Sequence, residues 1–149
     1  MYIKIKEFIM TNETKAIIKS TAPVLKEHGE AITQAMYKRL FEAHPEAKEL
    51  FKDAEPDQYK KLAAAVYAYA DNIDNLGALT KGIETMVKAH VKTNVQPMHY
   101  PWVGEAILGA IKEVLGDAAT EEVLSAWGEA FFFLADVLIA KEKEAYSKA

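Results

Sequence analysis

Histidine side chains are the residues of this chain best suited to bind a metal ion or to transfer protons near neutral pH, and the sequence has four of them. His28 and His44 stand beside a glycine and a proline, where helices are expected to end, so a solvated helix end accounts for both. His99 lies at an expected helix start, where a structural and a chemical role are both open. His90 differs, because apolar residues precede it by one helical turn. It is therefore predicted to project from an apolar helix face.

Spacing alone leaves two interpretations of His90. Met86 and Val87 place it on an apolar face, where a histidine is more often a core residue than a metal ligand. The chain has no cysteine, and no second histidine or carboxylate accompanies His90 at metal-ligand spacing such as HExxH. A zinc or di-iron site built by protein alone is therefore not expected. A single histidine ligand makes chemical sense where another molecule supplies the remaining ligands, as haem does with four pyrrole nitrogens.

The elements that carry these histidines are predicted to be helices. Alternation typical of a strand occurs only at Tyr2–Lys6, and elsewhere the apolar residues recur at helical spacing. Pro23 is expected to kink the first helix, because its ring clashes with the preceding turn. We expect one all-α domain of six or seven helices with short connections. The first helix is expected to start after Thr11 and Asn12 and to end near 28–29, and the second to run from near 32 to 44–45. After a short turn at 47–51, the third is expected to start after Asp57 and to end near 75–77, and the fourth to run from near 79 to 94. The last two are expected from Pro101 to 116–117 and from after Thr120 to near 146.

Composition narrows the class of protein. The 149 residues are about one domain's worth, and 50% of them are hydrophobic, enough for a core. The formal net charge of -4 argues against a nucleic-acid partner, which needs clustered lysine and arginine. The most apolar stretch, 130–135, is interrupted by Asp136 and is too short to span a bilayer, and the first residues lack the apolar centre of a signal peptide. We expect a soluble, cytoplasmic protein without a membrane span.

Several segments, in matching order and spacing, resemble the bacterial single-domain haemoglobins and the globin module of flavohaemoglobins. The resemblance runs from about Met10 to Tyr146 and implies an all-α globin fold of six to eight helices that sandwich one haem b. Because Met10 aligns with the usual start of this family, we expect 1–10 to be an N-terminal extension and 11–149 the globin domain. The segments that carry the resemblance are Ala22-Pro-Val-Leu-Lys-Glu-His-Gly29, Tyr37-Lys-Arg-Leu-Phe41, Phe51, Gln58, His90, His99-Tyr-Pro101 and Ala110-Ile-Lys-Glu-Val-Leu-Gly-Asp-Ala-Ala-Thr120.

The resemblance also implies roles for single residues around a haem. His90 would be the proximal iron ligand. Phe51 would pack against the haem face, and Leu62 would wall the distal pocket. Met86 and Tyr100 complete the expected haem contacts.

Tyr37 and Gln58 match the distal polar pair of the family. In an apolar pocket, a phenol donor stabilises the partial negative charge that a dioxygen ligand acquires. Gln58, taken alone, also suits a surface position in the first turn of a helix. Tyr59 stands where close relatives often have proline, which leaves the orientation of Gln58 open.

On the proximal side, Tyr100 and Glu142 match a pair associated with the histidine. A carboxylate that accepts from the imidazole N–H gives the ligand imidazolate character and favours oxygen activation. Taken alone, Lys141–Glu144 looks like a solvated helix end. Phe131 replaces a tyrosine of some relatives, so this network is expected to lack one hydrogen bond.

Three functions follow from the resemblance. The first is reversible binding of dioxygen, and of nitric oxide or carbon monoxide, for delivery, storage or buffering. The second is a nitric oxide dioxygenase, or a weak peroxidase-like enzyme, that works with a separate flavin reductase, since the sequence has no GxGxxG phosphate loop. The third, a globin-fold sensor or interaction module that holds no haem, is disfavoured because the ligand and both flanking pairs are present by residue type. Gas binding is the favoured interpretation.

Overall fold

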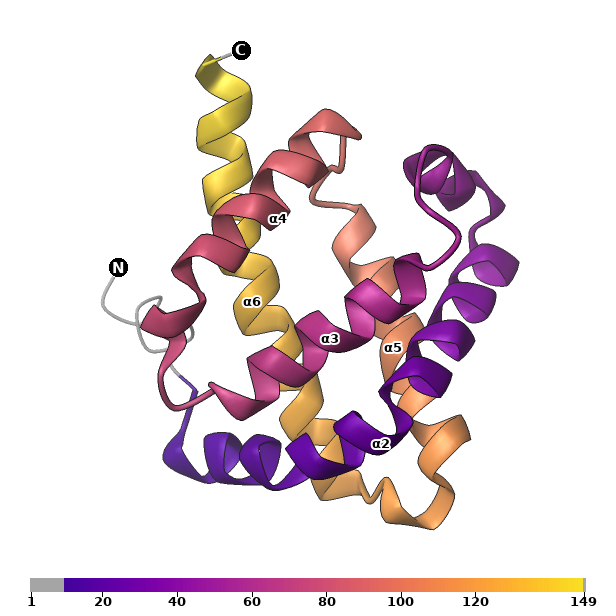
Figure 1. Cartoon of the computed structure of the whole chain (residues 1–149), viewed down its shortest axis with the longest axis vertical. Helices are drawn as coiled ribbons and strands as arrows, with labels where there is room; N and C mark the ends of the chain where they lie inside the picture. The colour runs from indigo at the N-terminus through magenta and orange to yellow at the C-terminus, as the bar shows by residue number, and fades with distance from the viewer. Residues whose placement is uncertain (1–9, 149) are drawn as a thin grey trace.

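The computed structural model describes residues 10–148, and every regular element in this part of the chain is helical. Residues 1–9, which include the alternating stretch at 2–6 and nearly all of the expected N-terminal extension, lie outside the described residues. Met10 is described and is buried in the main core. In chain order the elements are α2 (Asn12–Ala43), η1 (Pro45–Phe51), α3 (Gln58–Asp71), η2 (Leu76–Leu79), α4 (Thr80–Lys92), α5 (His99–Leu115), η3 (Gly116–Ala118) and α6 (Glu121–Lys148), where η marks a 3-10 helix (Figure 1).

The predicted break at 28–29 is wrong, because α2 runs on as one helix of 32 residues. Gly29 instead lies where α2 packs closely on α3. It is buried, and a Cβ added there would lie 3.4 Å from the Cβ of Ala63. Pro23 lies inside the helix, which changes direction along its length (Figure 1). Thr11 caps α2 as expected, since its hydroxyl accepts from the backbone N–H of Thr14 at 3.1 Å.

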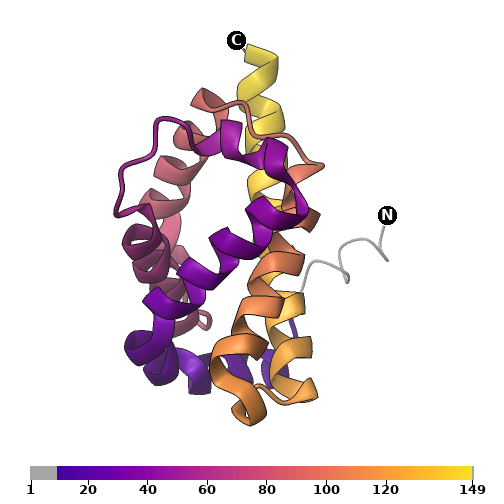
Figure 2. The same ribbon diagram turned by 90° about the vertical axis from the view of Figure 1, so that its right-hand side faces the viewer.

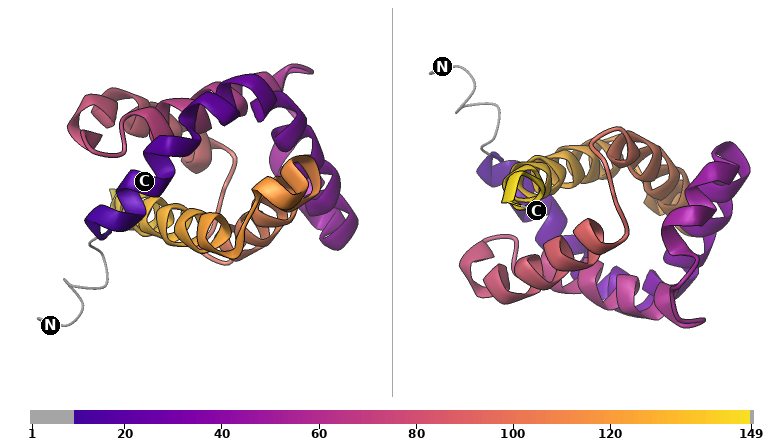
Figure 3. Two further views of the ribbon diagram at one scale, coloured as in Figure 1. Left: turned by 90° about the horizontal axis from the view of Figure 1, so that it is seen from below. Right: turned by 90° about the horizontal axis from the view of Figure 1, so that it is seen from above.

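The helices form two layers. End-on views show α3 and α4 on one side and α5 and α6 on the other (Figure 3), and α2 packs on α3, α5 and α6. The side view shows α6 running most of the length of the molecule, with its last turns beyond the main body (Figure 2). The main core is drawn from all of these helices except α4. A second cluster lies under α4, where Ile83, Met86 and Val87 pack against buried Tyr100 and Leu138.

Within the described residues, α6 is long and apolar enough to cross a membrane by length and composition alone. The apolar stretch at 130–135 is thus part of a longer apolar helix than the sequence suggested. The core helix of an all-α domain has the same properties, and α6 packs on α2, α4 and α5. Hydrogen bonds join its buried side to other helices, among them one from the Tyr69 hydroxyl to the Ala130 carbonyl and one from the Trp127 indole to the Thr21 hydroxyl.

Candidate functional site

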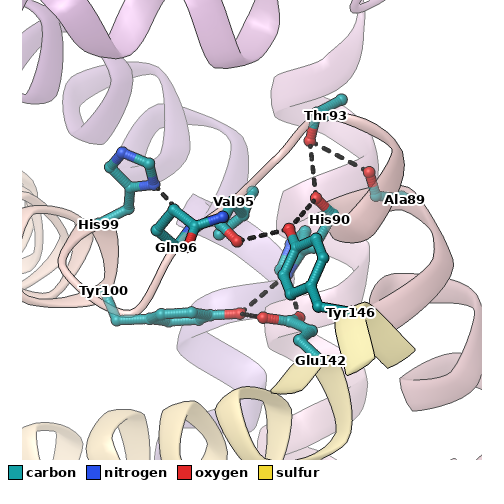
Figure 4. Close-up of polar contacts among 9 residues, drawn as sticks. All are labelled: Ala89, His90, Thr93, Val95, Gln96, His99, Tyr100, Glu142 and Tyr146. Atoms are coloured by element: carbon teal, nitrogen blue, oxygen red, sulfur yellow. Dashed lines mark hydrogen bonds and ion pairs between the residues drawn. The ribbon is translucent and has the colours of Figure 1, made fainter. Parts of the chain in front are cut away.

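His90 lies in the last turn of α4 with one side of its ring tied to two other helices (Figure 4). Its Nδ1 is 2.8 Å from Glu142 Oε2 on α6 and 3.0 Å from the Tyr100 hydroxyl on α5. No hydrogen bond joins Nε2 to any residue in the range 10–148. The His90 side chain is 29% exposed, so its free edge is accessible to a ligand.

Glu142 is a buried carboxylate with both oxygens paired. It is 3% exposed, whereas its neighbours Lys141 and Lys143 are exposed. Its Oε1 accepts from the Tyr100 hydroxyl at 2.6 Å, and its Oε2 faces the imidazole of His90. Burying a charged group is costly unless it is hydrogen-bonded, and these two contacts offset that cost. The charged segment at 141–144 is therefore solvated except at Glu142, which the structure brings to His90 as the resemblance implied.

The network fixes the tautomer of His90. Burial, followed by the hydrogen bond to Glu142 and its negative charge, raises the pKa of Tyr100, so this phenol stays a donor at neutral pH. Because Glu142 accepts from Tyr100 and faces Nδ1 with its other oxygen, the proton of the neutral imidazole belongs on Nδ1. The lone pair of His90 then lies on Nε2, the form in which histidine binds a metal.

The end of α4 is a Schellman motif that contains His90. The backbone N–H of Val95 donates to the His90 carbonyl at 2.9 Å, and that of Asn94 donates to the Val91 carbonyl at 3.1 Å. Asn94 has a φ of 66°, the left-handed conformation that this motif requires. The predicted helix end near 94 is confirmed, and its cap sets the backbone position of His90.

A second group of predicted residues surrounds a cavity of about 200 Å³. Tyr37 and Phe51 meet edge to face with ring centroids 5.1 Å apart. Burial raises the pKa of Tyr37 to about 12, and the Gln58 side chain partly opposes that rise. Tyr37 is therefore a neutral hydroxyl donor in an aromatic pocket. The cavity is lined by Tyr37, Phe41, Phe51, Ala54, Glu55, Pro56, Gln58 and Tyr59.

Tyr59 does not disturb the start of α3. Gln58 begins the helix, and the Tyr59 carbonyl accepts from the Thr33 hydroxyl of α2 at 2.7 Å. The N–H groups of a first turn have no partner within the helix, so proline and tyrosine fit the same backbone there. Gln58 consequently lines the cavity. Asp57 stands at the helix start as expected, but its side chain makes no capping hydrogen bond.

Two other predicted contacts do not line the cavity. Leu62 packs against the main core, and Met86 packs against the cluster under α4 that includes Tyr100. Both remain predicted haem contacts.

The other three histidines belong neither to the His90 network nor to the cavity lining. His28 is exposed, as predicted. His44 is half-buried and stacks flat on Trp102 with ring centroids 4.1 Å apart, a contact that its place at a helix end did not reveal. His99 accepts from the backbone N–H of Gln96 through Nδ1 at 2.9 Å, and burial lowers its pKa.

Sequence reasoning missed Tyr146, whose hydroxyl donates to the Val95 carbonyl at 2.7 Å (Figure 4). The available signal was its spacing, since Tyr146 follows Glu142 by four residues and so lies on the same helix face.

The residues present fit a haem. In residues 10–148 no three histidine or carboxylate side chains converge to hold a metal by themselves, so an ion at His90 needs ligands from another molecule. The lone pair of His90 provides the protein ligand, and the aromatic cavity with the Tyr37 hydroxyl suits a small polar ligand.

Comparison with known sequences gives a consistent picture. Residues 34–138 match the Globin family model. The chain is 51% identical over 140 residues to an uncharacterized globin-like protein of Aquifex aeolicus, covering 94% of this chain and 99% of that protein. It is 49% identical over 144 residues to a flavohemoprotein of Rhizobium meliloti, covering 95% of this chain but 36% of that protein. The chain thus spans about a third of the length of the flavohemoproteins it matches.

Two solved structures have the same fold as this chain. A Rhodothermus marinus protein, suggested to be a nitric oxide dioxygenase and engineered as a carbene transferase, superposes with a TM-score of 0.90 at 44% identity, covering 93% of this chain and 97% of that one. A bacterial globin from Campylobacter jejuni superposes with a TM-score of 0.84 at 36% identity, covering 92% and 99%.

Proposed function

This chain belongs to the globin family of haem proteins, and we propose that it holds one haem b through His90 and reversibly binds a diatomic gas, dioxygen foremost. Nitric oxide and carbon monoxide are further ligands in this proposal. We also propose that the protein is cytoplasmic, a location with which a sequence without cysteines is compatible.

One observation carries the proposal: the Nδ1 of His90 is held by a buried carboxylate and a buried phenol, and Nε2 is left with its lone pair. Haem, when bound, supplies an iron atom that can bind a diatomic gas. His90 would hold that iron through Nε2. Glu142 and Tyr100 would keep its ring from rotating and would keep the proton on Nδ1.

The cavity residues would act on the gas ligand. The neutral hydroxyl of Tyr37 can donate a hydrogen bond to a dioxygen ligand that carries partial negative charge. Gln58 supplies a second donor at the cavity wall, and the Phe51 ring packs edge to face against Tyr37. These hydrogen-bond donors would hold dioxygen more tightly than a purely apolar pocket of the same size.

A haem titration followed by visible spectroscopy tests the proposal. The protein should take up one equivalent of haem and give a Soret band that shifts on reduction and again under carbon monoxide. Failure to take up haem would refute the proposal and favour a haem-free sensor.

The carboxylate on His90 favours nitric oxide dioxygenase as a second candidate. A hydrogen bond from Nδ1 to Glu142 increases the basicity of the imidazole, which supports oxygen activation. The likeness to the Rhodothermus protein, which is suggested to be a nitric oxide dioxygenase, supports the same activity. Turnover needs an electron source, for which we propose a separate flavin reductase. Nitrate formation from dioxygen and nitric oxide with a supplied reductase tests this candidate, and absence of multiple turnovers would exclude it.

A further inference from the structure

Helix α6 contacts the segment around His90 at two successive turns. Glu142 lies against the imidazole. Tyr146 lies four residues further along the same helix face, and its hydroxyl donates to the Val95 carbonyl at 2.7 Å. The same hydroxyl is 3.4 Å from the His90 carbonyl, a weaker contact (Figure 4). The side chain and the backbone of His90 are therefore both held by α6.

The carbonyl groups that Tyr146 contacts belong to the cap of α4. The His90 carbonyl already accepts from the backbone N–H of Val95 at 2.9 Å. Val95 thus donates to His90 through its N–H and accepts from Tyr146 through its carbonyl. Asn94, between them, is in the left-handed conformation. The hydroxyl of Tyr146 therefore ties the cap of α4 to the last turns of α6.

This tie has a consequence for the direction of the imidazole. A hydrogen bond weakens steeply when its length or angle departs from the optimum. The 2.8 Å contact between His90 Nδ1 and Glu142 therefore depends on where α4 ends relative to α6. We propose that Tyr146 is a positioning residue that holds the His90 backbone on α6, so that Nδ1 stays on Glu142 and Nε2 keeps one direction. The inference rests on the proposed function only where Nε2 is said to bind iron.

A matched bond elsewhere in the molecule separates positioning from general stabilisation. The Tyr69 hydroxyl also donates to a backbone carbonyl of α6, that of Ala130, and also at 2.7 Å. Tyr69 belongs to the main core and not to the cluster that packs beside His90. Tyr69→Phe therefore removes an equivalent bond without touching the cap of α4. Tyr146→Phe keeps the ring and removes only the hydroxyl, at a half-buried position where the fold should tolerate it.

The first measurement uses amide hydrogen exchange of the haem-free protein. Tyr146→Phe should speed exchange of the Asn94 and Val95 amides by about twofold to tenfold, the effect of one net hydrogen bond, and Tyr69→Phe should leave them unchanged. Equal exchange in Tyr146→Phe and the wild type would overturn the inference, as would an equal effect of both variants.

The second measurement uses resonance Raman spectroscopy of the reduced haem-loaded proteins. The iron–histidine stretching band should move to lower frequency and broaden in Tyr146→Phe, and should match the wild type in Tyr69→Phe. An unmoved band in Tyr146→Phe would overturn the positioning role. A wild-type protein that shows no iron–histidine band would instead contradict the proposed function, so the two failures are distinguishable.

Discussion

Glu142 Oε2 lies 2.8 Å from His90 Nδ1, although 52 residues separate the two in the chain. The contact joins α6 to α4 across the cluster that packs under His90. Glu142 belongs to a charged helix end, and its carboxylate is nevertheless the hydrogen-bond partner of the buried side of the His90 ring. The proposed chemistry depends on this pair, because the carboxylate decides which imidazole nitrogen keeps its lone pair.

Glu142→Gln should weaken haem retention and lower the iron–histidine stretching frequency. Glutamine replaces one of the two carboxylate oxygens with an NH2 donor, and the Tyr100 hydroxyl and His90 Nδ1 use different oxygens. One of the two donors would then face another donor, and the buried group left unpaired costs about 1–3 kcal/mol in the free energy of unfolding. Denaturant unfolding and resonance Raman spectroscopy measure the two effects. Glu144→Gln is the control, because Glu144 is exposed and pairs only with Lys148. Equal behaviour of the two variants would contradict the role of Glu142.

Tyr37→Phe should speed dioxygen release. The variant loses one charge-assisted donor worth roughly 1.5–3 kcal/mol, which corresponds to an off-rate about tenfold to a hundredfold higher. Stopped-flow displacement of dioxygen by carbon monoxide measures that rate. Tyr67→Phe is the control, because Tyr67 is half-buried against the main core and does not line the cavity. An off-rate that stays unchanged in Tyr37→Phe would assign the stabilisation to Gln58 or to water.

Alkaline pH should destabilise the fold partly through Tyr37. Burial raises its pKa from 10.0 to about 12, so the folded state keeps a proton that the unfolded state loses above pH 10. Its contribution to stability is full below pH 10 and is lost as the pH rises through 12. The free energy of unfolding should therefore fall more gently over this range in Tyr37→Phe than in the wild type. Parallel curves would show that the Tyr37 hydroxyl is not desolvated.

Asn94→Ala should destabilise the protein by about 1–2 kcal/mol, because a left-handed backbone is unfavourable for alanine. Asn94→Gly should be neutral or slightly stabilising, since glycine adopts this conformation without strain. Urea unfolding measures both variants. Asn75→Ala provides the comparison, because Asn75 is exposed and has a φ of -148°. A loss in Asn94→Ala no larger than in Asn75→Ala would contradict the strain argument.

Local signals in the sequence located several parts of this fold. Thr11 and Thr120 cap helices as expected, and Pro101 lies in the first turn of α5. The expected end at 28–29 was wrong, because Gly29 marks a close approach to Ala63 and not a helix end. Periodicity cannot distinguish these two uses of glycine, since the partner lies on another helix.

In the site, too, local sequence patterns predicted one residue, and the other two depend on packing between distant helices. The apolar stripe predicted that His90 projects beside a core, and the packing under α4 agrees. Nothing in Lys141–Glu144 distinguishes Glu142 from its charged neighbours, because its burial depends on the packing of α6 against α4 and α5. The family resemblance supplied that assignment. Tyr146 contacts backbone carbonyls, and such acceptors are present at every residue, so the sequence gives no sign of which ones it meets.

The most direct test of the proposed site is the visible spectrum of haem-loaded His90→Ala beside that of His99→Ala. His99 belongs to the same stretch of chain, and its ring accepts a backbone N–H, so its loss should leave the spectrum as in the wild type. His90→Ala should lose most of its haem, or show a shifted Soret band that added imidazole restores. A wild-type spectrum in His90→Ala, with full haem retention, would contradict His90 as the iron ligand.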